Sequence, residues 1–309
     1  MAKTLAVVGA TGRQGGAVLN YVLDDPELSK QYTIRAITRD ANSEKAKQLG
    51  AKVDVVSADL SDRASLEKAL AGVHTIYIVT TPAFGSDAAE DEFNRGKTIA
   101  DVAVAQGVQY IIFSTLPATS KITGGKYTKV TPFDAKAKIE AYIRGLPIKS
   151  AFYAPGYFLE NFEGQPFLAP KPAGDGTWVI ERNVPPETEQ PWLDAVGDGG
   201  KFVGAILADP DKFEGKTLCA GTHYTLEQIA AILSKATGKT IAAKQIPNDE
   251  FEKGVPWLPE VFSEAFRAHA EFGYWGPDSK ELAAWATENA RGKLTTPEEF
   301  FAAHPLQLS

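Results

Sequence analysis

The sequence predicts an α/β fold in which a doubly wound parallel sheet is followed by a smaller C-terminal lobe of mixed α/β structure. In the first half of the chain, short β-branched runs alternate with segments of helical periodicity. The runs are almost continuously apolar, which is typical of parallel strands covered by helices on both faces. After about Gly156 this alternation ends, Pro and Gly become dense, and aromatic residues are scattered without a period. We therefore place the sheet in residues 1–156 and the lobe in residues 157–309.

Six strands are expected in the first part, with helical segments between them. The strands are placed at residues 5–8, 33–38, 53–56, 75–79, 110–113 and 148–153, and the helices at 16–23, 65–70, 88–106 and 133–144. In the lobe, residues 225–237 predict a helix, because Thr225 and Gln228 have the spacing of a capping box. Thr296 begins a last short helix by the same logic. Segments 192–207 and 216–220 are expected to return from the lobe to the main domain.

The bulk composition is that of an ordinary water-soluble globular protein, with 44% apolar and 23% charged residues. The formal net charge of −7 argues against nucleic acid and anionic membrane as partners. Cys219 is the single cysteine, so no intramolecular disulfide can form, and the four histidines lack the spacing of metal ligands. No apolar stretch is long enough to span a membrane, and no signal peptide is visible, so we expect a cytoplasmic protein without a bound metal.

A glycine-rich turn lies between the first strand and the first helix and spells G-x-x-G-x-x-G. Glycines are needed where the chain turns tightly and where the backbone approaches a pyrophosphate, and the helix N-terminus then faces the phosphates. This strand–turn–helix context predicts a nicotinamide dinucleotide site. The predicted contacts from the turn are Gly9, Thr11, Gly12, Arg13, Gln14 and Gly15.

The end of the second strand decides which dinucleotide is bound. An acid at this place holds a ribose 2′-hydroxyl, whereas an arginine meets a 2′-phosphate. Arg39 can bind phosphate in bidentate geometry, and Arg13 adds a second positive charge, so the sequence favours NADP(H). Asp40 follows directly and is an alternative partner for an unphosphorylated ribose.

Polar residues at the other strand ends are further candidates for cofactor contacts. Asp59 and Leu60 close the third strand, where they can meet an adenine, although Asp59 could equally cap the next helix. The fourth and fifth strands end in small polar residues that can line the ribose, the diphosphate or the nicotinamide. These residues are Thr80, Thr81 and Pro82, followed by Ser114 and Thr115.

The combination of motifs resembles the NmrA-like family of atypical short-chain dehydrogenases/reductases. Besides the glycine-rich turn, the resemblance includes segments 38–39, 59–60, 114–115, 133–136 and 155–162, and it continues through 207–210, 214–216 and 225–230. It implies a Rossmann-type domain, NADP binding and a small substrate-binding lobe. The family contains active reductases and also members that sense the nicotinamide state by binding alone.

The resemblance also implies where the chemistry takes place. Lys136 matches the family motif F-x-x-K, but Pro132 stands where typical short-chain reductases have the Tyr of Y-x-x-x-K. The proton donor is therefore open between Lys136, a hydroxyl and water, and the phenol of either Tyr153 or Tyr157 could replace the missing Tyr. The catalytic candidates are Lys136, Ser114 and Tyr157. Segment 155–161 is expected to cover the nicotinamide. Its predicted contacts are Pro155, Gly156, Tyr157, Phe158 and Asn161, with Tyr153 just before them.

Aromatic side chains are expected to form an apolar pocket for the substrate, although any single one could instead belong to the lobe core. The candidates for its walls are Phe84, Phe158, Phe162, Trp178, Trp192 and Trp257, and His223 could enter the pocket or be structural. The leading hypothesis is an NADPH-dependent reductase of a C=O, C=C or C=N bond in an apolar, aromatic small molecule. The alternative is a non-catalytic NADP(H)-binding redox sensor that acts through a protein partner.

Overall fold

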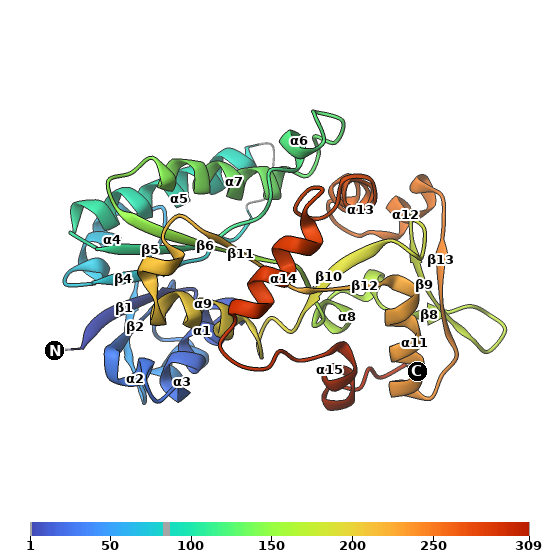
Figure 1. Cartoon of the computed structure of the whole chain (residues 1–309), viewed down its shortest axis with the longest axis horizontal. Coiled ribbons are helices and arrows are strands. Elements are labelled where there is room, and N and C mark those ends of the chain that lie inside the picture. Colours follow the sequence, from blue (N-terminus) through green and yellow to red (C-terminus); the bar gives the residue numbers. More distant parts are fainter. Residues whose placement is uncertain (1, 83–86, 309) are drawn as a thin grey trace.

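A seven-stranded parallel sheet forms the first part of the molecule in the computed structural model, which describes residues 2–82 and 87–308 (Figure 1). The strand order is β11-β6-β5-β4-β1-β2-β3, which confirms the predicted doubly wound α/β fold. Because all neighbouring strands are parallel, their carboxyl ends lie at the same edge of the sheet, and this edge faces the lobe in Figure 1. The strands are β1 (Lys3–Val8), β2 (Tyr32–Thr38), β3 (Asp54–Ser57), β4 (Thr75–Ile78), β5 (Tyr110–Ser114), β6 (Lys149–Pro155) and β11 (Thr217–Ala220).

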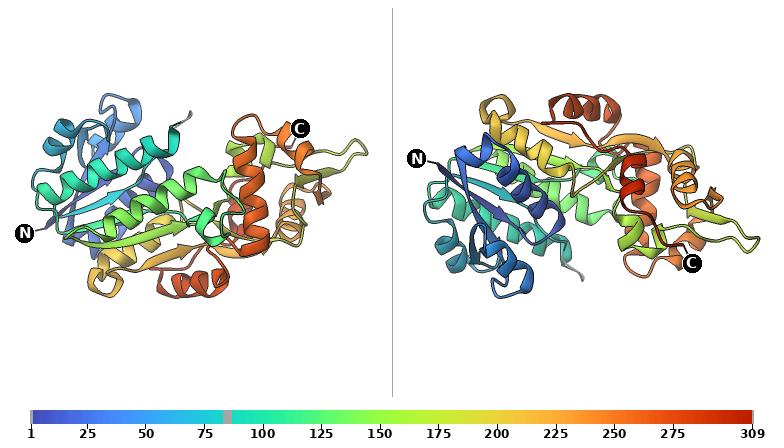
Figure 2. Two further views of the ribbon diagram at one scale, coloured as in Figure 1. Left: turned by 90° about the horizontal axis from the view of Figure 1, so that it is seen from above. Right: turned by 90° about the horizontal axis from the view of Figure 1, so that it is seen from below.

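Helices cover both faces of the sheet, because successive side chains of each strand point to opposite sides (Figure 2). Leu5 and Val7 of β1 pack in one core with α1 (Arg13–Asp24) and α9 (Gly199–Ala208). Ala6 and Val8 pack in the other core. That second core is completed by α4 (Arg63–Leu70), α5 (Ala88–Ala105) and α7 (Thr131–Arg144), while α2 (Leu28–Gln31) and α3 (Glu44–Gly50) lie beside β2 and β3.

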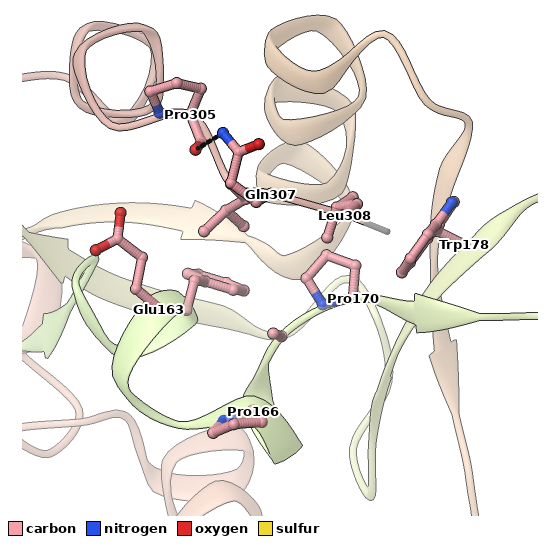
Figure 3. Close-up of a pocket in the computed structure, with 10 residues that line it drawn as sticks. Glu163, Pro166, Pro170, Trp178, Pro305, Gln307 and Leu308 are labelled. Carbon is pink, nitrogen blue, oxygen red and sulfur yellow. Dashed lines mark hydrogen bonds between the residues drawn. The ribbon is translucent and has the colours of Figure 1, made fainter.

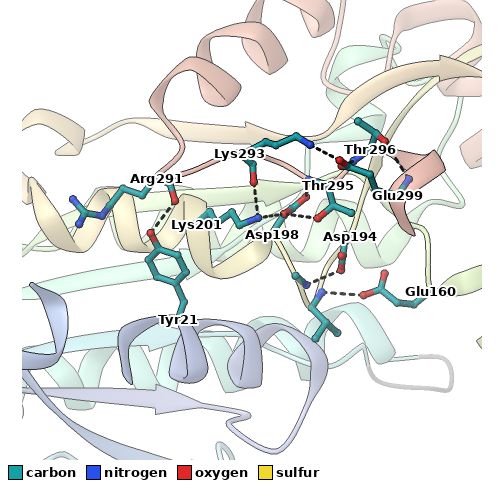
Figure 4. Close-up of polar contacts among 12 residues, drawn as sticks. Tyr21, Glu160, Asp194, Asp198, Lys201, Arg291, Lys293, Thr295, Thr296 and Glu299 are labelled. Atoms are coloured by element: carbon teal, nitrogen blue, oxygen red, sulfur yellow. Dashed lines mark hydrogen bonds and ion pairs between the residues drawn. The ribbon is translucent and has the colours of Figure 1, made fainter. Parts of the chain in front are cut away.

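Two elements from the second half of the chain belong to the first part of the molecule. β11 pairs in parallel with β6, and α9 packs on α1 at close range, because Gly200 and Gly204 present no side chain to the ring of Tyr21. Polar contacts tie both helices to the segment that follows α14 (Ser279–Asn289) (Figure 4). The Tyr21 hydroxyl of α1 donates to the backbone oxygen of Arg291 at 2.8 Å, and Lys201 Nζ of α9 donates to the backbone oxygen of Lys293 at 2.6 Å.

The lobe contains two small sheets and a layer of helices. The sheets run β12-β10-β7 and β13-β9-β8, and the predicted capping boxes are present at the start of α11 and α15. Among the described residues, no helix is long and apolar enough to cross a membrane. The strands are β7 (Tyr157–Phe158), β8 (Lys171–Pro172), β9 (Trp178–Arg182), β10 (Glu189–Leu193), β12 (Thr222–Thr225) and β13 (Ile241–Gln245). The helices are α8 (Asn161–Gly164), α11 (Leu226–Thr237), α12 (Asn248–Gly254), α13 (Pro259–Phe272), α14 (Ser279–Asn289) and α15 (Pro297–Ala303), with the short α6 (Thr119–Ile122) and α10 (Pro210–Phe213) on the sheet side.

Candidate functional site

The glycine-rich turn has the backbone geometry that close contact with a phosphate requires. Gly9 has a φ of +67°, and a Cβ on Gly15 would clash with the carbonyl group of Gly9. α1 begins at Arg13, and its N-cap residue Gly12 offers no side-chain cap. The first turn of the helix also lacks an acid, so its N-terminal N–H groups are free of competing anions from this helix.

A cavity of about 310 Å³ opens beside this turn, at the carboxyl ends of β1, β2 and β3. Most of the residues predicted for the adenosine half of the cofactor line it. These are Gly9, Thr11, Gly12, Arg39, Asp59, Leu60 and Thr81. Arg95 of α5 also lines the cavity and was missed by the sequence analysis, since a charge in the middle of a helix gives no local signal. The cavity thus carries two guanidinium groups.

The acids near the cavity have roles that the sequence left open. The Asp40 carboxylate accepts a hydrogen bond from the Asn42 backbone at 2.8 Å and shapes the loop before α3. The N-cap of α4 is Asp62, so Asp59 does not cap that helix. Instead, Asp59 Oδ1 accepts from the Ser61 backbone at 2.7 Å, and the residue remains at the cavity.

Gln14 connects the helix N-terminus with the ends of β4 and β5. Its Oε1 atom accepts hydrogen bonds from Ser114 Oγ at 2.6 Å and from the Tyr77 hydroxyl at 3.2 Å. Burial of Tyr77 raises the pKa of its phenol. The hydroxyl hydrogen of Ser114, a catalytic candidate, is therefore held by Gln14.

Lys136 forms a buried ion pair with Glu92 of α5. The two side chains are 8% and 1% exposed, and the Nζ–Oε1 distance is 2.6 Å. The ammonium group also donates to the backbone oxygen of Thr80 at 2.7 Å and to its hydroxyl at 2.8 Å. Desolvation lowers the pKa of Lys136, whereas the Glu92 charge opposes that shift. All three ammonium hydrogens thus have acceptors, and the pair fixes the end of β4 between α5 and α7.

The remaining predicted contacts at the sheet edge lie close to this pair. The Thr115 hydroxyl lies 3.5 Å from the backbone oxygen of Lys136, and Pro82 follows Thr80 and Thr81 at the end of β4. The Arg13 guanidinium lies against α8, because a Cβ on Gly164 would be 2.9 Å from its Nη2 atom. Contact of Thr80, Pro82, Thr115 and Arg13 with a cofactor stays a prediction.

The two candidate tyrosines occupy different environments. Tyr153 is 1% exposed, packs on Phe202 of α9, and its hydroxyl has no partner among the described residues. Burial raises the pKa of Tyr153 far above that of a free phenol. This core position does not fit the predicted cofactor contact. Tyr157 points into the lobe, where its hydroxyl lies 3.1 Å from Nδ1 of His269.

The rest of the segment after β6 is fixed by backbone contacts. Gly156 allows close passage of the chain, because a Cβ there would clash with the Pro191 carbonyl. The Pro155 backbone oxygen accepts from the Tyr274 hydroxyl at 3.2 Å. Phe158 packs against the core between α1 and α9, while Asn161 begins α8.

The aromatic residues predicted to wall one substrate pocket are distributed over several places, which corrects that expectation. Phe162 and Trp178 line a cavity of about 420 Å³ formed entirely by lobe residues, including Pro170 and Leu308 (Figure 3). Trp192 is 7% exposed and stacks on Phe162 with a centroid distance of 5.4 Å, so it belongs to the lobe core. His223 lines another cavity, beside Ser279 of α14. Phe84 lies outside the described residues.

The fold and the turn define a Rossmann-type protein of the NAD(P)-binding class. The model of the NmrA-like family matches residues 1–301, and the chain belongs to this family, which confirms the resemblance. An NmrA-like family domain-containing oxidoreductase of Aspergillus flavus, lnaB, is 30% identical, with 97% of each chain covered. The structure of the negative transcriptional regulator NmrA in complex with NAD has a TM-score of 0.79, 25% identity, and coverage of 97% of this chain and 94% of that chain. Triphenylmethane reductase of a Citrobacter species, complexed with NADP(H), shares the fold, with a TM-score of 0.76, 22% identity, and coverage of 98% and 100%.

Proposed function

We propose that the protein is an NADP(H)-dependent reductase that acts on a C=O, C=C or C=N bond of an apolar, aromatic small molecule. The observation that carries the cofactor assignment is the cavity with two guanidinium groups, Arg39 and Arg95. Among the described residues, neither side chain forms a salt bridge, so both charges are available to an anion. Asp40, the alternative partner for an unphosphorylated ribose, is used by its own loop.

The rest of the cofactor would be held by the turn and by the strand ends. The N-terminus of α1 would bind the diphosphate, and residues at the ends of β4, β5 and β6 would hold the nicotinamide half. A bound nicotinamide cofactor supplies hydride to the substrate, and the protein must supply the proton and the orientation. The cavity between α13 and α14 supports an aromatic substrate, because the rings of His223, Phe272 and Tyr274 line it and ring faces and edges stack favourably.

The cofactor assignment is tested by comparing the dissociation constants of NADPH and NADH. A charge-assisted hydrogen bond contributes about 1.5–3 kcal/mol, so Arg39→Gln should weaken NADPH binding about 10- to 100-fold. NADH binding should change much less. Lys138→Gln is the matched control, since it removes an exposed charge that pairs with Glu90 on the surface. Equal losses of NADPH and NADH affinity in Arg39→Gln would refute the 2′-phosphate assignment.

The reductase assignment is tested by following NADPH absorbance with a panel of aromatic ketones, enones and imines. Oxidation of NADPH that depends on one of these compounds is the expected result. One observation favours the second candidate, a non-catalytic redox sensor acting through a protein partner: the hydrogens of Lys136 and Ser114 are all held inside the protein. Tight NADPH binding without turnover across the panel would favour that sensor.

A further inference from the structure

Tyr157 and His269 form a polar pair at the centre of an aromatic cluster in the lobe. The Tyr157 hydroxyl lies 3.1 Å from His269 Nδ1. The Tyr157 ring stacks on Phe266 of α13 at a centroid distance of 5.6 Å and meets Tyr274 edge-on at 5.4 Å. His269 is 4% exposed, so the aromatic surroundings fix both members of the pair.

The cluster lies next to the Lys136 region of the site. The Phe133 ring is 5.6 Å from the ring of His269, and Phe133 stands one helical turn before Lys136 on α7. Tyr157 is the first residue of β7 and stands two residues after the end of β6, at the carboxyl edge of the sheet. Tyr157 is only partly buried, in contrast to His269 and Tyr274 beside it.

The hydrogen-bonding state of His269 follows from its surroundings. Its Nε2 atom is buried and has no partner among the described residues. Burial lowers the pKa of His269 to about 3, so the ring is neutral and carries one N–H group. A buried donor without a partner is rarer in proteins than a buried acceptor without one. One hydrogen of the pair lacks an acceptor in either tautomer: the hydroxyl hydrogen of the partly exposed Tyr157 when Nδ1 is protonated, or a hydrogen on the buried Nε2 atom when Nε2 is protonated. The preference therefore favours the hydrogen on Nδ1, where it has an acceptor, and a bare Nε2 atom.

We propose that His269 is a positioning residue, whose Nδ1–H group donates to the Tyr157 oxygen and leaves the hydroxyl hydrogen of Tyr157 free for a substrate carbonyl oxygen or imine nitrogen. The inference rests on the proposed reductase function and names the proton donor that the missing Tyr at position 132 left open. Among residues 2–82 and 87–308, the Tyr157 hydroxyl has no other hydrogen-bond partner.

A bound nicotinamide cofactor would supply a hydride, and with it two electrons, to the substrate carbon, and the electron pair of the double bond would move to the heteroatom. The O–H bond of Tyr157 breaks, the proton passes to that heteroatom, and a phenolate remains. His269 Nδ1–H stabilises the phenolate by a charge-assisted hydrogen bond. Solvent then returns one proton to Tyr157. His269 and Tyr274, whose rings pack against Tyr157, line a cavity of about 680 Å³ between α13 and α14.

The first test is the tautomer of His269, measured by ¹⁵N NMR on the cofactor-free protein labelled at its imidazoles. The chain has four histidines, so His269→Asn identifies the signal. We expect the Nδ1–H tautomer. An Nε2–H tautomer would overturn the proposal, because the Tyr157 hydroxyl would then be the donor to Nδ1. This result is independent of any turnover.

The second test uses turnover of the best substrate of the panel. We expect Tyr157→Phe to lower kcat by at least about 100-fold, as the loss of a general acid does, with little change in KM. His269→Leu should lower kcat about 10-fold, and His269→Asn should restore most of the rate, because its amide N–H can take the place of Nδ1–H. His269→Leu should have no further effect on kcat in a Tyr157→Phe background. His304→Asn, at the end of α15, is the control.

The outcomes separate the proposal from the function on which it rests. A protein that binds NADPH and reduces no compound contradicts the proposed function, and with it any proton transfer by the pair. Turnover that survives Tyr157→Phe, or equal loss in His269→Asn and His269→Leu, overturns the proposal alone. Urea denaturation of each variant shows whether a lost rate reflects lost folding.

Discussion

The buried pair of Lys136 and Glu92 leads to a strong prediction about stability. Glu92→Leu leaves the Lys136 ammonium 8% exposed in a protein environment, with only the two oxygens of Thr80 as partners. Removal of one member of a buried ion pair costs about 3–5 kcal/mol. The loss also has a ceiling, because the amine can release its proton. For an amine with an ordinary pKa of about 10.4, that release costs about 4.6 kcal/mol at pH 7.

The double variant should recover most of this loss. Lys136→Met alone leaves the Glu92 carboxylate with the Thr80 hydroxyl, and we again expect a loss of about 3–5 kcal/mol. Lys136→Met/Glu92→Leu removes both charges and keeps the volume apolar, a change that is often neutral or stabilising. The sum of the single losses should therefore exceed the loss of the double variant by at least about 3 kcal/mol.

Urea denaturation monitored by tryptophan fluorescence measures the four free energies of unfolding. pH supplies a second measure. The lowered pKa of Lys136 means that the unfolded state binds more protons below about pH 10.4, so this group adds stability as pH rises. Because Glu92 opposes the shift, its loss should enlarge the effect. Between pH 7 and pH 9, the deficit of Glu92→Leu relative to the natural protein should shrink by up to about 2.7 kcal/mol.

Additive losses in the two single variants would refute the interpretation of a coupled buried pair. An unchanged deficit of Glu92→Leu between pH 7 and pH 9 would show that Lys136 remains charged in that variant, in contact with water. Lys138→Gln supplies the surface control, because an exposed ion pair contributes about 0–1 kcal/mol.

Three further predictions concern the turn, a helix cap and the lobe histidine. Gly15→Ala should abolish NADPH binding as measured by titration, because its Cβ clashes with the Gly9 carbonyl and displaces the turn; binding within twofold of the natural protein would contradict this. Thr225→Ala removes the side-chain half of the capping box with Gln228 and should cost about 1 kcal/mol in urea denaturation, and a loss below a few tenths would show that water replaces the cap. Burial lowers the pKa of His269 to about 3, so the unfolded state binds more protons than the folded state between pH 3 and 6.5. The free energy of unfolding therefore decreases as the pH is lowered through this window. His269→Leu should flatten the unfolding free energy by about 1.4 kcal/mol per pH unit below pH 6.5, and parallel curves would disprove the neutral state.

The sheet could be predicted from the sequence because its signals are local. Apolar runs buried on both faces and separated by helical patterns leave few arrangements other than a doubly wound sheet. α13 was missed although its signal was present. Val261, Ala265, Ala268 and Phe272 have helical spacing, and Pro259 stands at a favourable helix start. The scattered aromatic residues of this region obscured the period.

The strand-end part of the site was predictable for the same reason. Arg39 and Asp59 stand within two residues of the ends of β2 and β3, and parallel topology brings such residues to one edge. The partners Glu92, Arg95 and His269 lie inside helices, far along the chain from the groups they meet. Nothing in their sequence neighbours distinguishes them from solvated charges or a core histidine, so only the packing of helices reveals them.

The packing also changes the question of catalysis. Lys136, the group that the family motif suggests, donates its three hydrogens to Glu92 and Thr80, and giving one away would leave a buried carboxylate without a counter-charge. The hydroxyl of Ser114 is held by Gln14. Tyr157 differs from both, since its single partner can act as a donor and leave its hydrogen free. Burial raises the pKa of the Tyr157 phenol, so a phenolate left after proton transfer would depend on the hydrogen bond from His269 Nδ1. If the protein is a reductase, the hydrogen bonds favour the phenol of Tyr157 over the amine of Lys136 as proton source, and the tautomer of His269 tests that choice.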